Sequence, residues 1–323
     1  MNATEENLIP GIATFAVPMP GPLASVNVHL VELDEGYLLV DTGWWMPESF
    51  SALEDELAGR AVAWHDIRTL LVTHLHPDHV GNADEVLRRS GARFLMHRVD
   101  AQNLAALAAI GRSPFFDEAW RLAGVPAEMR EKLDQRLRAH RRPVPERPPD
   151  WALEGGERIA IRGGSLEVVW TPGHSAGHVC LYSPEHRYLI AGDHLLEFIS
   201  PNVGWRPGDD MLARFLDSLE AIERLDIDWV LPSHGRPFRG ARARIHAIRQ
   251  HHEARCAEIL NHIRVEALTV QALLQRLWVR RLGLLETNFA VLEVLAHLEY
   301  LRRRGPVSAE AQPGGALEWR TFV

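Results

Sequence analysis

The sequence predicts an α/β protein in which helices cover layers of β-sheet, followed by a small helical region that ends in a β-hairpin. Short runs rich in Val, Leu and Ile end at polar or Gly residues, as strands do. Between these runs, apolar positions recur at three- and four-residue spacing, which predicts helices that bury one side on a sheet. After residue 240, three helical patterns precede two short extended runs, and this order indicates a winged-helix-like region.

The first 240 residues contain the predicted layered domain. Helices are predicted at residues 47–59, 83–90 and 211–225. Strands are predicted at residues 25–32, 37–41, 68–73, 166–171, 188–191 and 229–231. Between about residues 98 and 150, a helical segment laced with Arg and Glu ends in a proline-rich stretch that stops helices. We expect this segment to be an insertion over the face that carries the polar loops, with Phe115, Phe116 and Trp120 mostly packing its underside.

Residues 241–323 form the second predicted unit. Its helices are expected at 241–264, 269–282 and 286–304, with Thr269 as an N-cap and with Gly283 and Gly305 just past helix ends. A turn at residues 312–315 joins the two final extended runs. The sequence therefore predicts two domains, 1–240 and 241–323.

Composition places the chain among ordinary globular proteins. Apolar residues make up 46% and charged residues 24% of 323 residues. Because long apolar runs are absent and residues 1–11 lack a basic start, we expect a cytoplasmic protein without a membrane partner. Cys180 and Cys256 belong to no CxxC pair, so we expect small buried apolar residues rather than a disulfide or a thiolate metal site.

Charge is distributed unevenly along the chain. The formal net charge of −8 argues against general coating of nucleic acid. Residues 236–304 nevertheless hold thirteen Arg and six Glu, so this stretch is locally basic. Lys132 is the single lysine beside 34 arginines, a bias that also arises from genome composition and reduces the weight of the basic stretch.

The segment from Leu70 to Asn82 contains four potential metal ligands within six residues. An apolar run leads directly into His74, His76, Asp78 and His79, a density of His and Asp that serves no purpose in a packed core. Two His separated by one residue point the same way from an extended backbone. Neutral imidazole and carboxylate oxygen suit Zn²⁺, with Fe²⁺ and Mn²⁺ as alternatives.

Three further candidate ligands each follow a predicted strand directly. They are His174 in a TPGH turn, Asp193 in a GD turn and His234 in an SHG turn. Loops that follow strands gather at one edge of a sheet, where their side chains can converge. A catalytic zinc takes about three protein ligands plus water, so this number of ligands predicts two metal ions.

The motifs HxHxDH, TPGH, GD and SHG, in this order, resemble the metallo-β-lactamase superfamily and closely its glyoxalase II-like branch. The resemblance covers roughly residues 10–240 and implies an αββα sandwich of two mixed sheets between helices. It assigns His74, His76 and His174 to one metal, Asp78, His79 and His234 to the other, and Asp193 to both. Asp41, in a DTG turn, is then expected to accept a proton from the ring of a ligand His.

This arrangement predicts hydrolysis. Two cations about 3.5–4 Å apart can hold a bridging water whose pKa falls toward about 7, so hydroxide is the expected nucleophile. Asp78 is expected to ligate a metal first, and to orient the hydroxide and accept its proton second. Phe198 and Trp205 follow ligand-bearing turns and are candidates for the wall of a substrate pocket.

Other histidines and apolar residues are expected to play structural parts. His178 and His194 exceed the ligands that the resembled family uses, so we expect hydrogen-bonding or exposed side chains. His251 and His252 lie on a charged helix and are expected to be solvated. Phe289, Leu292, Leu295 and Leu298 read as an ordinary helix core, although part of that surface could serve a homodimer.

Three functions remain open at this point. The first is hydrolysis of a small ester, thioester or related acyl compound, in the manner of glyoxalase II. The second is cleavage of phosphodiesters, since β-lactamase-like endoribonucleases combine this domain with a small C-terminal helical region, and Arg contacts phosphates. The third is a non-catalytic binding or regulatory protein. β-Lactam cleavage is not expected, because B1-type β-lactamases of this fold carry Cys where this chain has Asp193.

Overall fold

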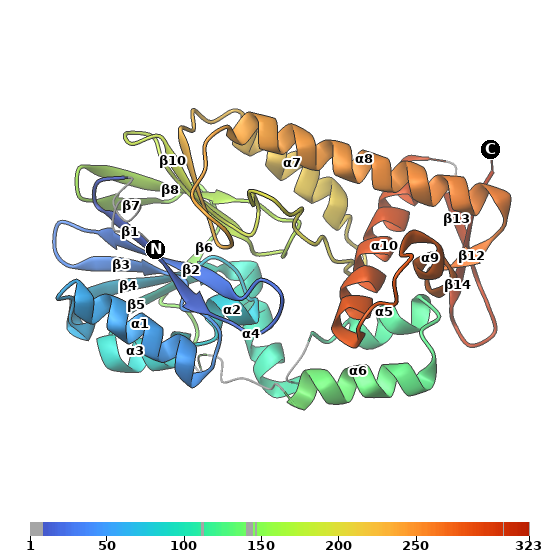
Figure 1. Cartoon of the computed structure of the whole chain (residues 1–323), viewed down its shortest axis with the longest axis horizontal. Coiled ribbons are helices and arrows are strands. Elements are labelled where there is room, and N and C mark those ends of the chain that lie inside the picture. The colour runs from blue at the N-terminus through green and yellow to red at the C-terminus, as the bar shows by residue number, and fades with distance from the viewer. Residues whose placement is uncertain (1–8, 111–112, 140–144, 146, 306, 323) are drawn as a thin grey trace.

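The computed structural model of the chain describes residues 9–110, 113–139, 145, 147–305 and 307–322 (Figure 1). Within these residues, two β-sheets lie face to face and helices cover their outer faces, which confirms the predicted αββα sandwich. Residues 1–8, used above to predict the compartment, and residues 140–144 and 146 of the proline-rich stretch lie outside the described part. No described helix has both the length and the hydropathy needed to cross a membrane.

The first sheet has six strands in the order β1-β2-β3-β4-β5-β6, with β3 to β6 parallel to one another and β1 and β2 antiparallel to their neighbours. Its middle strands are buried on both faces, because Leu38 and Leu71 face the second sheet while Leu39 and Leu70 face the outer helices. The strands are β1 (Ile12–Pro18), β2 (Ser25–Glu32), β3 (Tyr37–Val40), β4 (Ile67–Val72), β5 (Arg93–His97) and β6 (Trp151–Leu153). The outer layer contains α1 (Pro47–Gly59), a short 3₁₀ turn (Trp64–Asp66), α3 (Ala83–Ser90) and α4 (Arg98–Ile110).

The second sheet has five strands in the order β11-β10-β9-β8-β7, of which only β10 and β11 are parallel. They are β7 (Arg158–Ile161), β8 (Gly164–Trp170), β9 (Val179–Ser183), β10 (Tyr188–Gly192) and β11 (Trp229–Pro232). Leu189 and Ala191 on the outer face pack in one core with Phe215 of α7 (Met211–Glu223) and Ile245 of α8 (Ala241–Val265). Each helix therefore buries its apolar side on the sheet, as the spacing predicts.

The C-terminal region consists of helices and a small three-stranded sheet, in the order β12-β14-β13, as the predicted winged-helix-like pattern requires. Its elements after α8 are β12 (Leu268–Thr269), α9 (Val270–Leu277), α10 (Leu284–Arg304), β13 (Val307–Ala311) and β14 (Leu317–Thr321). The hydroxyl of Thr269 accepts from Ala272 N, so the predicted N-cap is present. The helix that follows ends earlier than predicted, at Leu277.

The predicted insertion contains α4 and two further helices, α5 (Phe116–Leu122) and α6 (Ala127–Ala139), which lie against α10 (Figure 1). Trp120 on α5 is fully buried, and its Nε1 donates to Asn288 Oδ1 on α10 at 2.8 Å. α8 extends from the second sheet to the C-terminal region, and one apolar core includes residues of both (Figure 1). The domain boundary at residue 240 stays a prediction.

Two predictions about single side chains on α8 and α10 are wrong. His252 was expected in solvent, but it is 2% exposed because α10 covers its side of α8, while its neighbour His251 is exposed as predicted. Phe289 was expected in the helix core, but it is 53% exposed on the first turns of α10. Leu292 and Leu295, further along that helix, are buried as predicted.

Candidate metal centre

All seven predicted ligands lie together at the edge of the sandwich where the strands end. β4 leads into His74, which is followed by His76 and by the short helix α2 (Pro77–Val80) with Asp78 and His79. The other three follow the carboxyl ends of β8, β10 and β11: His174, Asp193 and His234. The structure therefore brings together side chains that are up to 160 residues apart in sequence.

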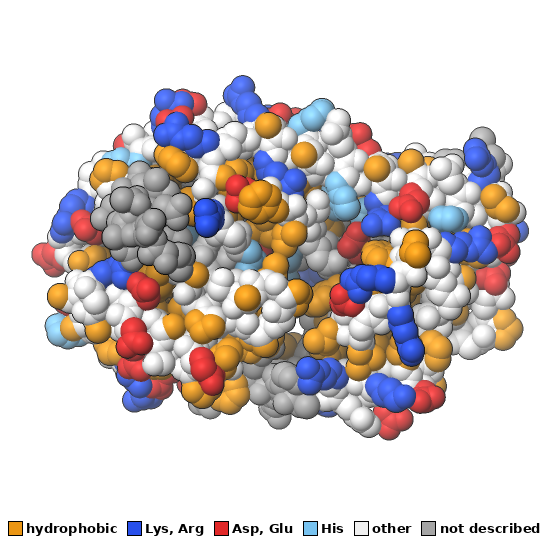
Figure 2. Space-filling model, in the orientation of Figure 1, with side chains coloured by type: hydrophobic (Ala, Val, Ile, Leu, Met, Phe, Trp, Pro, Cys, Tyr) orange, Lys and Arg blue, Asp and Glu red, His pale blue; other side chains and the backbone are white. Residues whose placement is uncertain are grey.

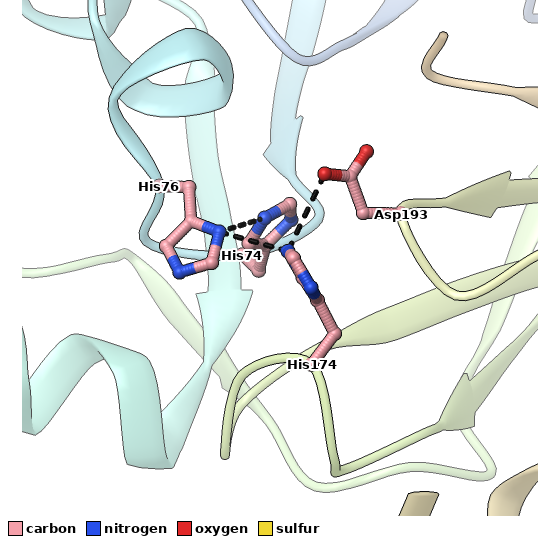
Figure 3. Close-up of side chains that lie close together, drawn as sticks. All are labelled: His74, His76, His174 and Asp193. Atoms are coloured by element: carbon pink, nitrogen blue, oxygen red, sulfur yellow. Dashed lines mark hydrogen bonds and ion pairs between the residues drawn. The ribbon is translucent and has the colours of Figure 1, made fainter. Parts of the chain in front are cut away.

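The first group is formed by His74, His76, His174 and Asp193 (Figure 3). His76 Nδ1 lies 2.9 Å from His74 Nε2 and 2.8 Å from His174 Nε2. His174 Nε2 lies 3.3 Å from Asp193 Oδ2. Three imidazole nitrogens and a carboxylate oxygen thus point toward one another.

The second group is formed by Asp78, His79 and His234. Asp78 Oδ2 lies 3.3 Å from His234 Nε2 and 3.8 Å from His79 Nε2. All three residues are buried.

Asp193 lies between the two groups. Its Oδ2 faces His174 of the first group, whereas its Oδ1 lies 3.5 Å from both His79 Nε2 and His234 Nε2 of the second. One carboxylate can therefore contact an ion in either group.

Three of the ligand rings have a hydrogen-bond partner on the nitrogen that points away from the groups, and this partner fixes the orientation of the ring. His79 Nδ1 donates to Asp41 Oδ2 at 2.7 Å, and His234 Nδ1 donates to Ser25 O at 2.9 Å. His174 Nδ1 donates to Asn202 O at 2.8 Å. With each proton on the outer nitrogen, the inner nitrogen presents a lone pair.

Asp41 lies where the DTG turn was expected to bring it. Besides the bond from His79, its carboxylate accepts hydrogen bonds from Thr73 N and Thr73 Oγ1. Its φ of 66° belongs to the left-handed region, which Asp adopts more readily than most residues. The turn thereby directs the carboxylate beneath the loop of His74 and His79.

The site attracts positive charge: burial opposes it, but the carboxylates of Asp41, Asp78 and Asp193 hold the pKa of His79 well above its usual range. Burial lowers the pKa of His76 to about 3, so its ring is neutral at pH 7. Burial opposes ionisation of Asp78, but the neighbouring rings of His79 and His234 outweigh it and lower the pKa of Asp78 to about 2. Burial would raise the pKa of Asp193, but the nearby rings of His79 and His174 outweigh burial and hold that pKa well below its usual range.

The donor set fits divalent metal ions. His79 Nε2, Asp193 Oδ1 and His234 Nε2 are buried polar atoms without hydrogen-bond partners among the described residues. Such atoms are costly to bury unless a ligand satisfies them. Imidazole nitrogen and carboxylate oxygen are donors that zinc, iron and manganese accept. Both groups could therefore hold a metal ion.

His178 and His194 lie beside the candidate ligands without joining either group. His178 is buried; its Nδ1 contacts Thr171 Oγ1 at 2.8 Å and its Nε2 accepts from Asp193 N at 3.1 Å, so it supports the main chain of Asp193. Gly192 makes this possible, because a Cβ there would lie 2.4 Å from His178 Nε2. His194 was expected to be hydrogen-bonded or exposed, but it is buried against the ring of Phe215, and neither ring nitrogen has a hydrogen-bond partner among the described residues.

Asp100 on α4 was missed by the sequence analysis. Its buried carboxylate accepts hydrogen bonds from three donors on the two loops that carry the histidines of the first group: Leu75 N at 2.8 Å, Ser175 Oγ at 3.1 Å and Gly177 N at 3.0 Å. A Cβ at Gly177 would lie 2.5 Å from Asp100 Cγ, so this contact requires glycine. Two of the three donors are backbone amides, which leave no pattern in a sequence.

The two predicted pocket residues have different environments. Phe198 is 79% exposed, whereas Trp205 is buried in the core, with its backbone N donating to Leu292 O. Of the two, Phe198 offers its surface to a ligand. Figure 2 shows a hollow between the sandwich and the C-terminal region, on the face that it displays.

Comparisons with known proteins agree with this geometry. Residues 21–234 match the metallo-beta-lactamase superfamily, and residues 256–322 match the metallo-beta-lactamase-like C-terminal domain. An atrochrysone carboxyl ACP thioesterase from Aspergillus fumigatus is 24% identical over 217 residues, which are 67% of this chain and 39% of that protein. The probable metallo-hydrolase YqjP from Bacillus subtilis is 28% identical over 244 residues, which are 72% of this chain and 74% of that protein.

Relatives differ in length from this chain. It spans between 39% and 66% of the length of three fungal proteins that it matches.

Two solved structures are similar over nearly the whole chain. A beta-lactamase domain protein from Burkholderia ambifaria has a TM-score of 0.87 and 28% identity, covering 97% of this chain and 93% of that one. A metallo-beta-lactamase family protein from Thermus thermophilus has a TM-score of 0.82 and 34% identity, covering 97% of this chain and 99% of that one. With its fold, its His and Asp groups and these matches, the chain belongs to the metallo-β-lactamase superfamily.

Proposed function

We propose that this protein is a hydrolase that uses two metal ions and acts on a small ester, thioester or related acyl compound, in the manner of glyoxalase II. The position of Asp193 is the observation that carries the proposal. Its two oxygens face the first and the second group, respectively, so the ions would be neighbours that share a ligand. Neighbouring ions are the arrangement that two-metal hydrolysis requires.

The residues have distinct parts in this proposal. His74, His76 and His174 would hold one ion, Asp78, His79 and His234 the other, and Asp193 both. Bound zinc ions would lower the pKa of water toward about 7 and polarise the oxygen of the scissile group. Asp78 is ionised and buried beside His234, so its carboxylate can ligate an ion first and orient the attacking water second. Asp41 keeps the proton of His79 on Nδ1.

Charge pairing favours an acyl substrate over nucleic acid. At least seven of the thirteen arginines between residues 236 and 304 form ion pairs with acidic side chains: Arg249, Arg255, Arg276, Arg280, Arg302, Arg303 and Arg304. Paired arginines have less charge to offer to phosphates. The thioesterase named among the relatives also supports an acyl substrate.

The test is turnover by metal-loaded protein of acyl esters and thioesters beside single-stranded RNA and bis(p-nitrophenyl) phosphate. Asp78→Ala is the variant expected to lose turnover. Asp55→Ala, an exposed carboxylate on α1 at the outer layer, is the matched control and should keep it. Thiol release from a thioester, followed with a thiol-reactive dye, gives the rate directly.

The outcomes separate the three functions. Thioester or ester turnover that disappears in Asp78→Ala supports the proposal. Turnover of RNA or the phosphodiester alone, with an affinity that falls steeply with salt, would replace it with phosphodiester cleavage. Full metal occupancy without turnover of any of these compounds would instead favour a non-catalytic binding protein.

A further inference from the structure

Asn202 connects the candidate metal centre to α10 of the C-terminal region. Its backbone oxygen accepts the hydrogen bond from His174 Nδ1 at 2.8 Å. Its side-chain Nδ2 donates to Glu293 Oε2 at 3.1 Å and lies 3.4 Å from Phe289 O, both on α10. One residue therefore contacts a candidate ligand through its main chain and the C-terminal region through its side chain.

The residues after Asn202 are fixed on the same helix. Trp205 N donates to Leu292 O at 3.0 Å, and Val203 and Trp205 are buried in the core that includes Leu292. A carbonyl in such a segment moves only when the segment moves relative to α10. The position of the acceptor for His174 is therefore set by a helix that lies more than 80 residues later in the chain.

Glu293 is suited to hold the amide of Asn202. Glu293 is partly buried between α10 and Asn202, with 17% of its side chain exposed, and this burial raises the pKa of its carboxyl group. Arg255 on α8 faces it, but Arg255 Nε is 4.0 Å from Oε1, so Asn202 Nδ2 is the nearer donor. Arg255 is held in turn by Glu258 and by the ring of Trp278, 4.7 Å from the guanidinium.

A carboxylate that is largely removed from water is costly unless it accepts hydrogen bonds, and a bond to an ionised acceptor is stronger than one between neutral groups. An apolar side chain at position 293 would not carry this desolvation cost. The bond to Asn202 offsets part of the cost and limits the motion of the main chain that orients His174.

We propose that Glu293 and Asn202 are positioning residues for His174: together they hold the Asn202 carbonyl against Nδ1, so that Nε2 faces the first group. The inference rests on the proposed metal centre, and it gives the C-terminal region a part in metal binding. Removing the hydrogen-bond partner of the outer ring nitrogen of a ligand His weakens metal binding about 10- to 100-fold.

The experiment titrates metal-free protein with Co²⁺ and follows the visible absorption, which reports ligand geometry as well as affinity. The variants are Asn202→Ala, Glu293→Ala and the double substitution. Each should bind the ion of the first group about 10- to 100-fold more weakly with an altered spectrum, and the double variant should be no weaker than the weaker single variant. Glu293→Gln keeps an oxygen that can accept from Asn202 and should restore the wild-type titration.

Glu299→Ala is the matched control. Glu299 lies on the same helix and forms ion pairs with Arg302 and Arg303, so its loss perturbs α10 without touching Asn202. It should titrate as the wild type does. Equal weakening in this control, unchanged titrations in both single variants, or additive losses in the double variant would each overturn the inference.

Folding and metal binding are checked separately. If Glu293→Ala does not fold, Asn202→Ala decides alone, because its side chain is only half-buried. Wild-type protein that takes up no Co²⁺ would overturn the proposed metal centre, and this inference with it. Wild-type uptake together with unchanged variants would overturn the inference alone.

Discussion

Replacing Asp100 with Asn should loosen the candidate metal centre without altering any candidate ligand. The carboxylate accepts hydrogen bonds from Leu75 N, Ser175 Oγ and Gly177 N, on two loops that are about 100 residues apart in sequence. An Asn at this position has one acceptor oxygen and an amide group that can only donate. With the oxygen toward Leu75 and Ser175, the amide meets the N–H of Gly177, and two donors face each other.

The cost follows from the number of affected hydrogen bonds. One backbone N–H loses its acceptor, which costs about 1–3 kcal/mol, and the two remaining bonds lose an ionised acceptor, which costs about 1 kcal/mol each. Burial raises the pKa of Asp100, so removing the charge recovers part of its desolvation cost. The expected net loss in the free energy of unfolding is about 2 kcal/mol. The spacing of the two loops is less fixed as well, and the ion of the first group should bind about tenfold more weakly.

Two measurements check this expectation. Urea unfolding of the metal-free protein gives the loss of stability, and a Co²⁺ titration gives the affinity. Asp150→Asn is the matched control, because Asp150 also accepts a backbone amide, from Phe94 at 2.7 Å, but is exposed at the edge of the first sheet. Wild-type stability and affinity in Asp100→Asn, or an equal loss of affinity in Asp150→Asn, would show that Asp100 does not hold the two loops.

Three other substitutions have defined outcomes. Asp193→Ala should prevent uptake of both ions, since its oxygens face both groups; elemental analysis that finds both ions retained would contradict the shared position. Trp120→Ala should lower the free energy of unfolding by about 3–5 kcal/mol, because a fully buried indole and its hydrogen bond to Asn288 are lost. A loss of less than about 1 kcal/mol, measured by urea unfolding, would argue against this packing. Burial lowers the pKa of His252 to about 3 and that of His297 to about 4, so both are neutral in the folded protein while the unfolded chain takes up protons below about pH 6.5. Stability should therefore fall by about 2 kcal/mol per histidine between pH 6.5 and 5, and His297→Gln should flatten this fall; an unchanged slope would refute the assignment.

The sequence alone predicts the ligand cluster and several helices, because these features depend on residues that are close together in the chain. The density of His and Asp after β4 has no packing explanation, so the gathering of these residues at one edge could be predicted without a structure. α1 and α3 span the residues that the amphipathic spacing predicts. β9, by contrast, was not predicted: it directly follows a polar turn, and its sequence VCLYS mixes Cys, Tyr and Ser with only two of the aliphatic residues that marked the predicted strands.

Burial that depends on distant segments could not be predicted. The burial of His252 depends on α10, where His297 Nε2, 45 residues later in the chain, lies 3.1 Å from His252 Nδ1. Phe289 fits the apolar spacing of α10 but lies on a side of the helix that leaves it 53% exposed. Asp100 lies in an unremarkable helical stretch, and its importance comes from backbone amides of two loops that the fold brings to it.

α10 explains why the two predicted domains are difficult to separate physically. Along little more than one turn of this helix, Asn288 accepts from Trp120 of the insertion, and Glu293 accepts from Asn202 beside His174. The same helix contributes to the apolar core that includes the outer face of the second sheet. Because these contacts share one rigid element, a displacement of α10 changes the insertion and the loop of His174 together. The boundary at residue 240 therefore marks a change in sequence pattern, whereas the contacts that support the metal centre cross it.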